Sequence, residues 1–263
     1  MFYGAVMQKQ ILVLLLLVIS LSAYASSDYE IMTENYPPFN YFKDGKPRGA
    51  VFNVVKEIQK KIGWQNEVKL YSWNRAYKSV KTESNKILFS MAKTDIRTPD
   101  FKWVGPILSR KGYFFKNKDV KRTPLDREDI KNNFIVGVRE NSNIHLNFTK
   151  EGYKSIVPLE NTEAYYRGLY FKRIELIIAS PYNIPVRAKK YGLNADVFEQ
   201  TKVQAGVGTL FIAFSKDTPD DIIKLWQDAL DSIKEEGLLQ KLIKTGMEGA
   251  EKDFEIKYHI NEF

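Results

Sequence analysis

The sequence predicts an α/β protein built as two lobes, each with a largely parallel sheet flanked by helices. Short apolar stretches typical of strands alternate along the chain with amphipathic stretches of helical period, as a parallel sheet requires. The chain beyond residue 25 is about 238 residues long, which is large for one core and suits two cores of roughly a hundred residues each. In such sheets ligands bind at the carboxyl edge, where loops lead into helix N-termini.

Residues 1–25 have the pattern of a secretory signal peptide. Lys9 provides positive charge, residues 11–23 form an almost unbroken apolar run, and Ala23-Tyr24-Ala25 matches an A-x-A cleavage site. The apolar run is about 13 residues, shorter than the roughly 20 that a membrane-spanning helix needs. We therefore expect export to the periplasm with cleavage after Ala25, and a membrane anchor is the alternative interpretation.

The composition excludes several kinds of site. The chain has no cysteine, so we expect neither disulfides nor a lipid-anchored N-terminus, and its two histidines, His145 and His259, do not suffice for a histidine-built metal site. The net charge of +8 comes from scattered basic residues, in tracts of two at most. This pattern indicates a solvated surface. We expect a monomer without metal, cofactor or nucleic-acid partner.

The N-terminal part of the chain alternates strand and helix patterns. The apolar residues from Val51 to Ile62 keep helical spacing, and Gly63 follows them as a C-cap. Before this helix, Pro37 and Pro38 impose an extended loop that carries aromatic residues. The predicted elements are a strand at 29–33, a helix at 51–62, a strand at 67–71, a helix from 73 to 81 and a strand at 87–91.

The remainder of the chain predicts a second α/β lobe followed by two helices. A polar turn leads into a helix that Ser142 or Asn141 would cap, and the free amides of this helix N-terminus could hold an anion. Pro219 marks the first position of one later helix, Gly237 precedes another, and residues 247–263 carry no clear pattern. The predicted elements are strands at 112–115, 134–138, 155–158, 174–178 and 206–214, a helix from 162 to 171, and a charged irregular segment at 117–129.

Arg97 is the strongest candidate for a ligand-binding residue. Its guanidinium offers a planar fork of donors that matches a carboxylate in bidentate geometry and keeps its charge at physiological pH. An arginine in a polar stretch is usually a solvated surface residue. Arg97, however, lies just beyond the predicted strand at 87–91, at the carboxyl edge of the sheet. Its position therefore favours a binding role as much as its chemistry does.

Short motifs spread along the whole mature chain form one ordered pattern. They are Tyr36-Pro37-Pro38-Phe39, Asp44-Gly45, Gly49, Trp73, Thr94 with Arg97, Trp103-Val104-Gly105-Pro106, Val136-Gly137-Val138 with Ser142, and Ile212-Ala213-Phe214-Ser215-Lys216. Each motif is weak alone. Their order and spacing together resemble the periplasmic solute-binding proteins of family 3, which serve polar amino-acid ABC transporters.

The resemblance implies the type II periplasmic-binding-protein fold, in which two crossing strands join the lobes. Lobe 1 would comprise residues 26–111 and 213–263, and lobe 2 residues 112–212. The ligand would be held in a cleft between the lobes, which would close on it because a ligand that touches both lobes favours the closed state.

The resemblance also implies a set of ligand-binding residues. Arg97 would clamp the ligand carboxylate, assisted by main-chain amides near Ala92 and Asn143. Trp73 and Tyr36 would cover the apolar part of the ligand, although core packing is the alternative role for such aromatic residues. The implied ligand-binding residues are Tyr36, Trp73, Ser90, Ala92, Thr94, Arg97, Arg139, Ser142, Asn143 and Ser180.

Two positions depart from the family's pattern. Ala92 stands where amino-acid binders usually carry Ser or Thr, and Ser180 aligns with an acidic residue that holds the ligand's α-ammonium group. An ammonium without a carboxylate partner in a closed cleft would be poorly stabilised. We therefore expect a ligand that keeps a carboxylate but is not recognised as an ordinary α-amino acid. Lys93 and Arg139 could add positive charge for a second anionic group, whereas a solvated surface position is the commoner role of such residues.

Together these features predict a non-catalytic receptor that delivers a small carboxylate-bearing solute to an inner-membrane ABC permease. Presentation of the ligand to a chemoreceptor or sensor kinase is an alternative that the residues do not distinguish. A periplasmic enzyme resembling cyclohexadienyl dehydratase would need a proton donor in the cleft. The matching positions hold only Thr33, Ala92 and Ser180, so we expect no enzyme.

Overall fold

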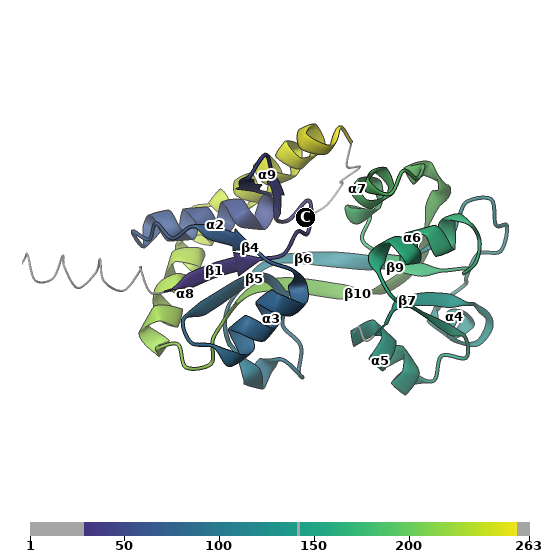
Figure 1. Cartoon of the computed structure of the whole chain (residues 1–263), viewed down its shortest axis with the longest axis horizontal. Coiled ribbons are helices and arrows are strands. Elements are labelled where there is room, and N and C mark those ends of the chain that lie inside the picture. Colours follow the sequence, from purple (N-terminus) through teal and green to yellow (C-terminus); the bar gives the residue numbers. More distant parts are fainter. Residues whose placement is uncertain (1–28, 141–142, 257–263) are drawn as a thin grey trace, which may run out of the picture. The chain divides into compact units, whose positions relative to one another are not determined.

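The computed structural model describes residues 29–140 and 143–256 and separates the chain into two compact units (Figure 1). The first unit, which we call unit 1, holds the described residues up to Ile107 together with Leu210–Gly246, and unit 2 holds Leu108–Thr209 and the described residues from Met247 onward. The signal-peptide prediction and Ser142 lie outside the described residues. The lobe boundaries at 111/112 and 212/213 stay a prediction. The predicted class, α/β in two lobes, is confirmed.

Unit 1 is built on a parallel core of three strands. Strand β1 pairs in parallel with both β4 and β5, and the end of β10 then runs antiparallel to β5. Its elements are β1 (Glu30–Thr33), β2 (Tyr41–Lys43), β3 (Lys46–Arg48), α2 (Ala50–Lys61), β4 (Val68–Leu70), α3 (Trp73–Thr82), β5 (Lys86–Ala92), a 3-10 turn (Thr98–Asp100), the start of β6 (Lys102–Asn117), the end of β10 (Phe198–Phe214), α8 (Asp220–Glu235) and most of α9 (Leu238–Phe254).

Helices α2 and α3 cover opposite faces of this sheet (Figure 1). Met32 of β1 and Leu88 of β5 pack against Ala76 and Val80 of α3. Their neighbours along the strands point to the other face, because side chains alternate along a strand. The 3.6-residue spacing of buried Val51, Val54, Val55 and Ile58 explains why α2 buries one face.

The loop before α2 is held by close backbone packing. The Phe39 carbonyl accepts the amide hydrogen of Val51 at 2.8 Å, and the Pro38 carbonyl accepts that of Ala50 at 3.1 Å. Gly49 has φ 121°, and a Cβ there would lie 2.5 Å from the Phe39 oxygen. Only glycine fits this approach. The predicted motifs at 36–39 and 49 therefore contact each other.

Unit 2 is also built of strands and helices, and its strands β7, β8 and β9 are short. Strands β7 and β8 are parallel, Val136 bridges in parallel to Leu176, and β9 pairs antiparallel with β6. Its elements are the end of β6, α4 (Arg127–Asn133), β7 (Val136–Arg139), α5 (Asn143–Glu151), β8 (Ile156–Leu159), α6 (Thr162–Tyr170), β9 (Ile177–Ala179), α7 (Asn183–Lys190), a 3-10 turn (Ala195–Val197) and the start of β10. No described helix is long and apolar enough to cross a membrane.

Three helical segments differ from the sequence prediction. Helix α4 begins inside the predicted irregular segment, where Asp126 caps it by accepting from the Asp129 amide at 2.8 Å. Helix α7 carries Pro185 in its first turn, where proline is tolerated but hides the helical pattern. Helix α9 continues to Phe254 because Met247 and Ala250 are buried. Pro219, expected at the first helical position, precedes α8 as its N-cap.

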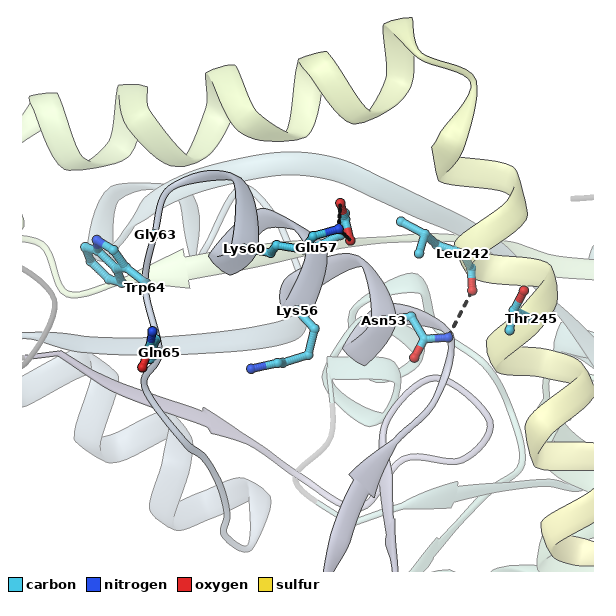
Figure 2. A pocket seen from close by; sticks show the side chains of 9 residues that line it. All are labelled: Asn53, Lys56, Glu57, Lys60, Gly63, Trp64, Gln65, Leu242 and Thr245. Carbon is cyan, nitrogen blue, oxygen red and sulfur yellow. Dashed lines mark hydrogen bonds and ion pairs between the residues drawn. The ribbon is translucent and has the colours of Figure 1, made fainter.

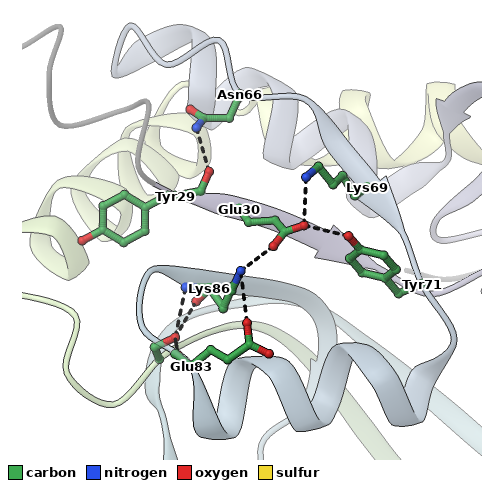
Figure 3. A network of polar contacts seen from close by, with 8 residues as sticks. Tyr29, Glu30, Asn66, Lys69, Tyr71, Glu83 and Lys86 are labelled. Atoms are coloured by element: carbon green, nitrogen blue, oxygen red, sulfur yellow. Dashed lines mark hydrogen bonds and ion pairs between the residues drawn. The ribbon is translucent and has the colours of Figure 1, made fainter.

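Glu30 ties the three parallel strands together (Figure 3). Its carboxylate contacts Lys86 of β5 at 2.5 Å, Lys69 of β4 at 3.0 Å and the Tyr71 hydroxyl at 2.8 Å. Lys86 also contacts Glu83 at 3.3 Å. The hydrogen bond from Lys86 is the main reason that the pKa of Glu30 falls from 4.5 to about 2, and the same bond raises the pKa of Lys86.

We predict that this network makes unit 1 acid-sensitive. Because the pKa of Glu30 is depressed, its stabilising contribution is complete above pH 4.5 and is lost as the pH falls toward 2. Glu30→Gln should lower the free energy of unfolding by about 2–3 kcal/mol at pH 7 and by much less near pH 2. Denaturant unfolding across this pH range measures the difference. A constant difference between the two proteins at all pH values would contradict the prediction.

We also predict that Gly246 cannot take a larger residue. A Cβ at Gly246 would lie 2.5 Å from the Ala50 Cα, so α9 could no longer approach α2 as closely. Gly246→Ala should destabilise the protein by about 1–3 kcal/mol in denaturant unfolding. Gly249→Ala is the matched control, because its Cβ meets no atom within 4 Å. It should be neutral or add roughly 0.5–1 kcal/mol through helix propensity.

Candidate functional site

Six of the predicted site residues lie in unit 1, at or near the carboxyl ends of the three parallel strands. Tyr36 comes soon after β1, Trp73 begins α3 a short distance after β4 ends, and Arg97 follows β5, whose last residue is Ala92. Since β1, β4 and β5 run in the same direction, their carboxyl ends meet at one edge of the sheet. The sheet topology thus brings residues from three distant stretches of sequence to the same edge.

Arg97 is held by aromatic rings. Its guanidinium carbon lies 5.2 Å from the Trp73 ring centre and 5.4 Å from that of Tyr77, and one of its nitrogens donates to the Ala92 carbonyl at 3.2 Å. Within residues 29–140 and 143–256, no carboxylate forms an ion pair with Arg97. A ring face attracts a cation without neutralising it. The side chain is therefore oriented while its charge stays available to an anion.

The backbone around Arg97 forms a compact turn. The Thr94 carbonyl accepts the amide hydrogens of Arg97 at 2.9 Å and of Thr98 at 2.8 Å, and the Thr98 hydroxyl donates to the same oxygen at 2.8 Å. The short 3-10 turn then begins at Thr98, with Pro99 as its second residue. Thr94 therefore fixes the position of Arg97 through its backbone.

The aromatic residues at this edge form a continuous series, which we call the aromatic row. Successive ring centres lie 5.6 Å apart from Trp73 to Tyr77, from Tyr77 to Phe101 and from Phe101 to Trp103, and 6.1 Å apart from Trp103 to Phe211. Of the row, sequence reasoning assigned only Trp73 to the site. Tyr77 could have been found from its spacing, because it lies four residues after Trp73 on the same helix face. The contact of Phe211 is tertiary and has no local signal.

Three hydroxyl groups at predicted site positions are buried without a hydrogen-bond partner in the described part of the chain. They are Ser90 Oγ, Thr94 Oγ1 and Ser180 Oγ. Ser90 is 5% exposed and has φ 65°, in the left-handed region that L-residues rarely adopt, and Ser180 is 2% exposed. Buried polar groups are nearly always paired in proteins. Within the described residues, the hydrogen-bonding capacity of these three hydroxyls is therefore unused.

In unit 2, two predicted site residues lie at the ends of neighbouring strands. Arg139 is the exposed last residue of β7, and Ser180 directly follows β9. The Gly137 amide donates to the Leu176 carbonyl at 2.9 Å, so these parallel segments end at the same edge. Asn143 begins α5, and its side chain, like the whole of Ser142, is not described.

Tyr165 of α6 fixes the segment that leads to Ser180. Its hydroxyl donates to the Ile178 carbonyl at 2.6 Å and accepts the Ile178 amide hydrogen. Burial raises the pKa of Tyr165 far above its usual value, so the hydroxyl stays protonated. Ser180 lies two residues after this anchor. Sequence reasoning did not identify Tyr165, because its contact with β9 arises only from the fold.

A pocket of about 690 Å³ in unit 1 lies between α2, the loop that follows it, and α9 (Figure 2). Asn53 donates to the Leu242 carbonyl at 3.2 Å across it, and Lys60 pairs with Glu57 at 3.2 Å. None of the ten predicted site residues lines this pocket. Among the described residues there is also no group of three or more His, Cys, Asp or Glu that could hold a metal ion.

Comparison with known proteins identifies the family. The model of the bacterial extracellular solute-binding proteins, family 3, matches residues 30–245. A "probable histidine-binding protein" of Campylobacter jejuni is 27% identical over 222 residues, which are 80% of this chain and 80% of that protein.

Solved structures share the fold. One is the amino acid ABC transporter substrate-binding protein AbpA of Streptococcus pneumoniae bound to L-arginine, with a TM-score of 0.68 and 21% identity over 87% of this chain and 98% of that chain. Another is a histidine kinase sensor domain with similarity to periplasmic binding proteins, with a TM-score of 0.72 and 14% identity over 85% and 97%. From the family match, the chain belongs to the bacterial extracellular solute-binding proteins, family 3.

Proposed function

We propose that this protein is a non-catalytic periplasmic receptor that captures a small carboxylate-bearing solute and delivers it to an inner-membrane ABC transporter. The observation that carries the proposal is the state of Arg97. Its guanidinium rests on Trp73 and Tyr77, donates to a single carbonyl, and has no ion-pair partner among the described carboxylates. A ligand carboxylate is the partner that best matches its remaining donors.

The neighbouring groups complete the proposed recognition. Trp73 and Tyr36 would cover the apolar part of the ligand, since both are partly exposed at the same sheet edge. The unpaired hydroxyls of Ser90, Thr94 and Ser180 would bond to its polar atoms. A buried hydroxyl without a partner costs about 1–3 kcal/mol, and a ligand that pairs with it recovers this cost on binding.

The residues at the two positions where the family holds an α-ammonium group favour a ligand other than an ordinary α-amino acid. Ala92 offers only backbone groups, and Ser180 offers a neutral hydroxyl where an ammonium would need a carboxylate. One relative is named as a probable histidine-binding protein, and one similar solved structure is bound to L-arginine. For this chain we propose a related organic anion as the ligand. A ligand-binding screen should test amino acids beside such anions.

In the proposed mechanism the ligand bridges two lobes, residues 26–111 with 213–263 and residues 112–212. A ligand that contacts both lobes binds the closed form more tightly, so binding shifts the equilibrium toward closure by that difference in affinity. The transporter would recognise the closed form.

Two alternative functions differ from the proposal, one in the partner protein that receives the ligand and the other in having catalytic activity. A sensor client would use the same ligand site, and the kinase sensor domain shows only that the fold occurs in such proteins. Permease and ATPase genes beside this gene would favour uptake. A dehydratase-like reaction needs a proton donor, and Thr33, Ala92 and Ser180 carry no carboxyl group. Turnover of prephenate or arogenate by the purified protein would establish the enzyme instead.

We predict that Arg97→Ala abolishes ligand binding while the protein stays folded. A thermal-shift screen of the mature protein against carboxylates, amino acids and larger anions identifies the ligand, because binding to the native state alone raises Tm. The shift should vanish in Arg97→Ala. Arg75→Ala is the matched control, because Arg75 also lies over an aromatic ring, that of Tyr71 at 4.0 Å, but is not a predicted site residue.

The control should keep the full shift. If the best ligand still raises the Tm of Arg97→Ala, Arg97 is not the carboxylate clamp. If the best ligand is a simple α-amino acid, the inference from Ala92 and Ser180 is wrong.

We further predict that the unpaired hydroxyls serve binding and not stability. Ser90→Ala and Ser180→Ala should leave the free energy of unfolding unchanged or slightly higher, because they remove unsatisfied buried groups, and should weaken ligand binding. Ser215→Ala is the control. The Ser215 hydroxyl donates to the Glu83 carbonyl at 2.6 Å and accepts the Lys86 amide hydrogen at 3.0 Å, so its loss should cost about 1–3 kcal/mol. Equal destabilisation by all three substitutions would contradict this division.

A further inference from the structure

A second cation lies on the aromatic row. The Lys93 ammonium is 6.0 Å from the Trp103 ring centre and 5.7 Å from that of Phe211. Lys93 is exposed, and no carboxylate of the described residues forms an ion pair with it. Arg97 occupies the Trp73 end of the row and Lys93 the Phe211 end. The two cations therefore lie over rings at opposite ends of the aromatic row.

The Arg97 guanidinium lies close to the backbone of Lys93. Arg97 donates to the Ala92 carbonyl at 3.2 Å, and the peptide bond of that carbonyl leads directly into Lys93. Because one peptide spans 3.8 Å between Cα atoms, the Arg97 guanidinium lies within about 7 Å of the Lys93 Cα. Arg97 thus contacts the peptide from which the Lys93 side chain branches.

The nearby acidic residues leave these charges largely uncompensated. Asp100 is already paired with Lys81 at 2.7 Å. Asp95 lies between the two cations in sequence, is exposed, and forms no ion pair within the described residues. The ring faces restrict the otherwise flexible lysine side chain and leave its three N–H donors free to turn toward a ligand.

We infer that the ligand carries two anionic groups, one bound by Arg97 and the other by Lys93, so that the substrate class is a small dianion such as a dicarboxylate. This inference rests on the proposed function, because it assumes that Arg97 binds the first carboxylate. It also gives a physical reason for a specificity that differs from that of the relative named for histidine and of the structure bound to L-arginine. A ligand with a basic side chain directed along the aromatic row would meet the Lys93 ammonium, whereas an acidic one would pair with it.

The test compares dianions with monoanions of equal carbon number. Glutarate with pentanoate, succinate with butyrate, and 2-oxoglutarate with 2-oxopentanoate are titrated calorimetrically into the mature protein. We expect at least one dianion to bind the wild-type protein ten-fold or more tightly than its monoanion. Lys93→Gln should remove this preference while keeping the monoanion affinity, and Lys93→Arg should restore much of it. Lys78→Gln, on the exposed side of α3, is the control and should change neither.

The variants separate failure of this inference from failure of the proposed function. If Arg97→Ala abolishes binding but Lys93→Gln keeps the dianion preference, only the role of Lys93 is wrong. If binding survives in Arg97→Ala, the clamp itself is wrong, and this inference falls with it. Equal affinity of the wild-type protein for both members of every pair, or no binding of any dianion, overturns the inference.

Discussion

The parallel pairing of β1 with β4 and β5 is the constraint on which the candidate site depends. One carboxylate, that of Glu30, contacts residues of β4 and β5 and the hydroxyl of Tyr71 just beyond β4. It therefore helps to set the relative position of three strands that are not consecutive in sequence. The carboxyl ends of the same strands carry the loops with Tyr36, Trp73 and Arg97. The contacts of Glu30 near the start of β1 thus stabilise the strands. The carboxyl edge of the same sheet carries hydroxyl groups that have no hydrogen-bond partner among the described residues.

Unit 1 contains buried serine hydroxyls of two kinds, paired and unpaired. Ser215 is buried at the start of the segment after β10, and its hydroxyl bonds to Glu83 and Lys86. Ser90 is also buried, yet its hydroxyl has no partner among the described residues and its backbone has a positive φ. Both features cost stability in the isolated protein. Such costs are expected where a chain is adapted to bind a molecule and not only to fold.

Periodic patterns and cap residues allowed much of the fold to be predicted. The helices α2, α3 and α8 follow from apolar spacing, and Gly63 has φ 74° just beyond α2, as its role at the helix end requires. The helix α7 could not be found, because Pro185 obscures its first turn. The continuation of α9 depends on the burial of Met247 and Ala250, which only tertiary contacts determine. The local sequence shows helix caps and apolar periodicity. It does not show which distant residues bury a helix whose own pattern is weak.

The candidate site, like the fold, was predicted from the sequence only in part. Arg97 and Trp73 were predicted from motif order, and the structure brings their side chains into contact. Tyr77, Phe101 and Phe211 were not assigned to the site, because aromatic residues at helical or strand spacing more often belong to the core. The roles of all ten predicted site residues stay predictions, and Ser142 lies outside the described residues.

The use of rings in place of carboxylates to hold Arg97 has a consequence for affinity. A carboxylate partner within the protein would orient the guanidinium as firmly, but a ligand carboxylate would then have to compete with it for the same donors. An aromatic face holds the cation through the ring quadrupole and leaves its charge intact. The same argument applies to Lys93 over Trp103 and Phe211. Because both cations are preorganised without being neutralised, little of the attraction of an anionic ligand is spent on breaking existing ion pairs.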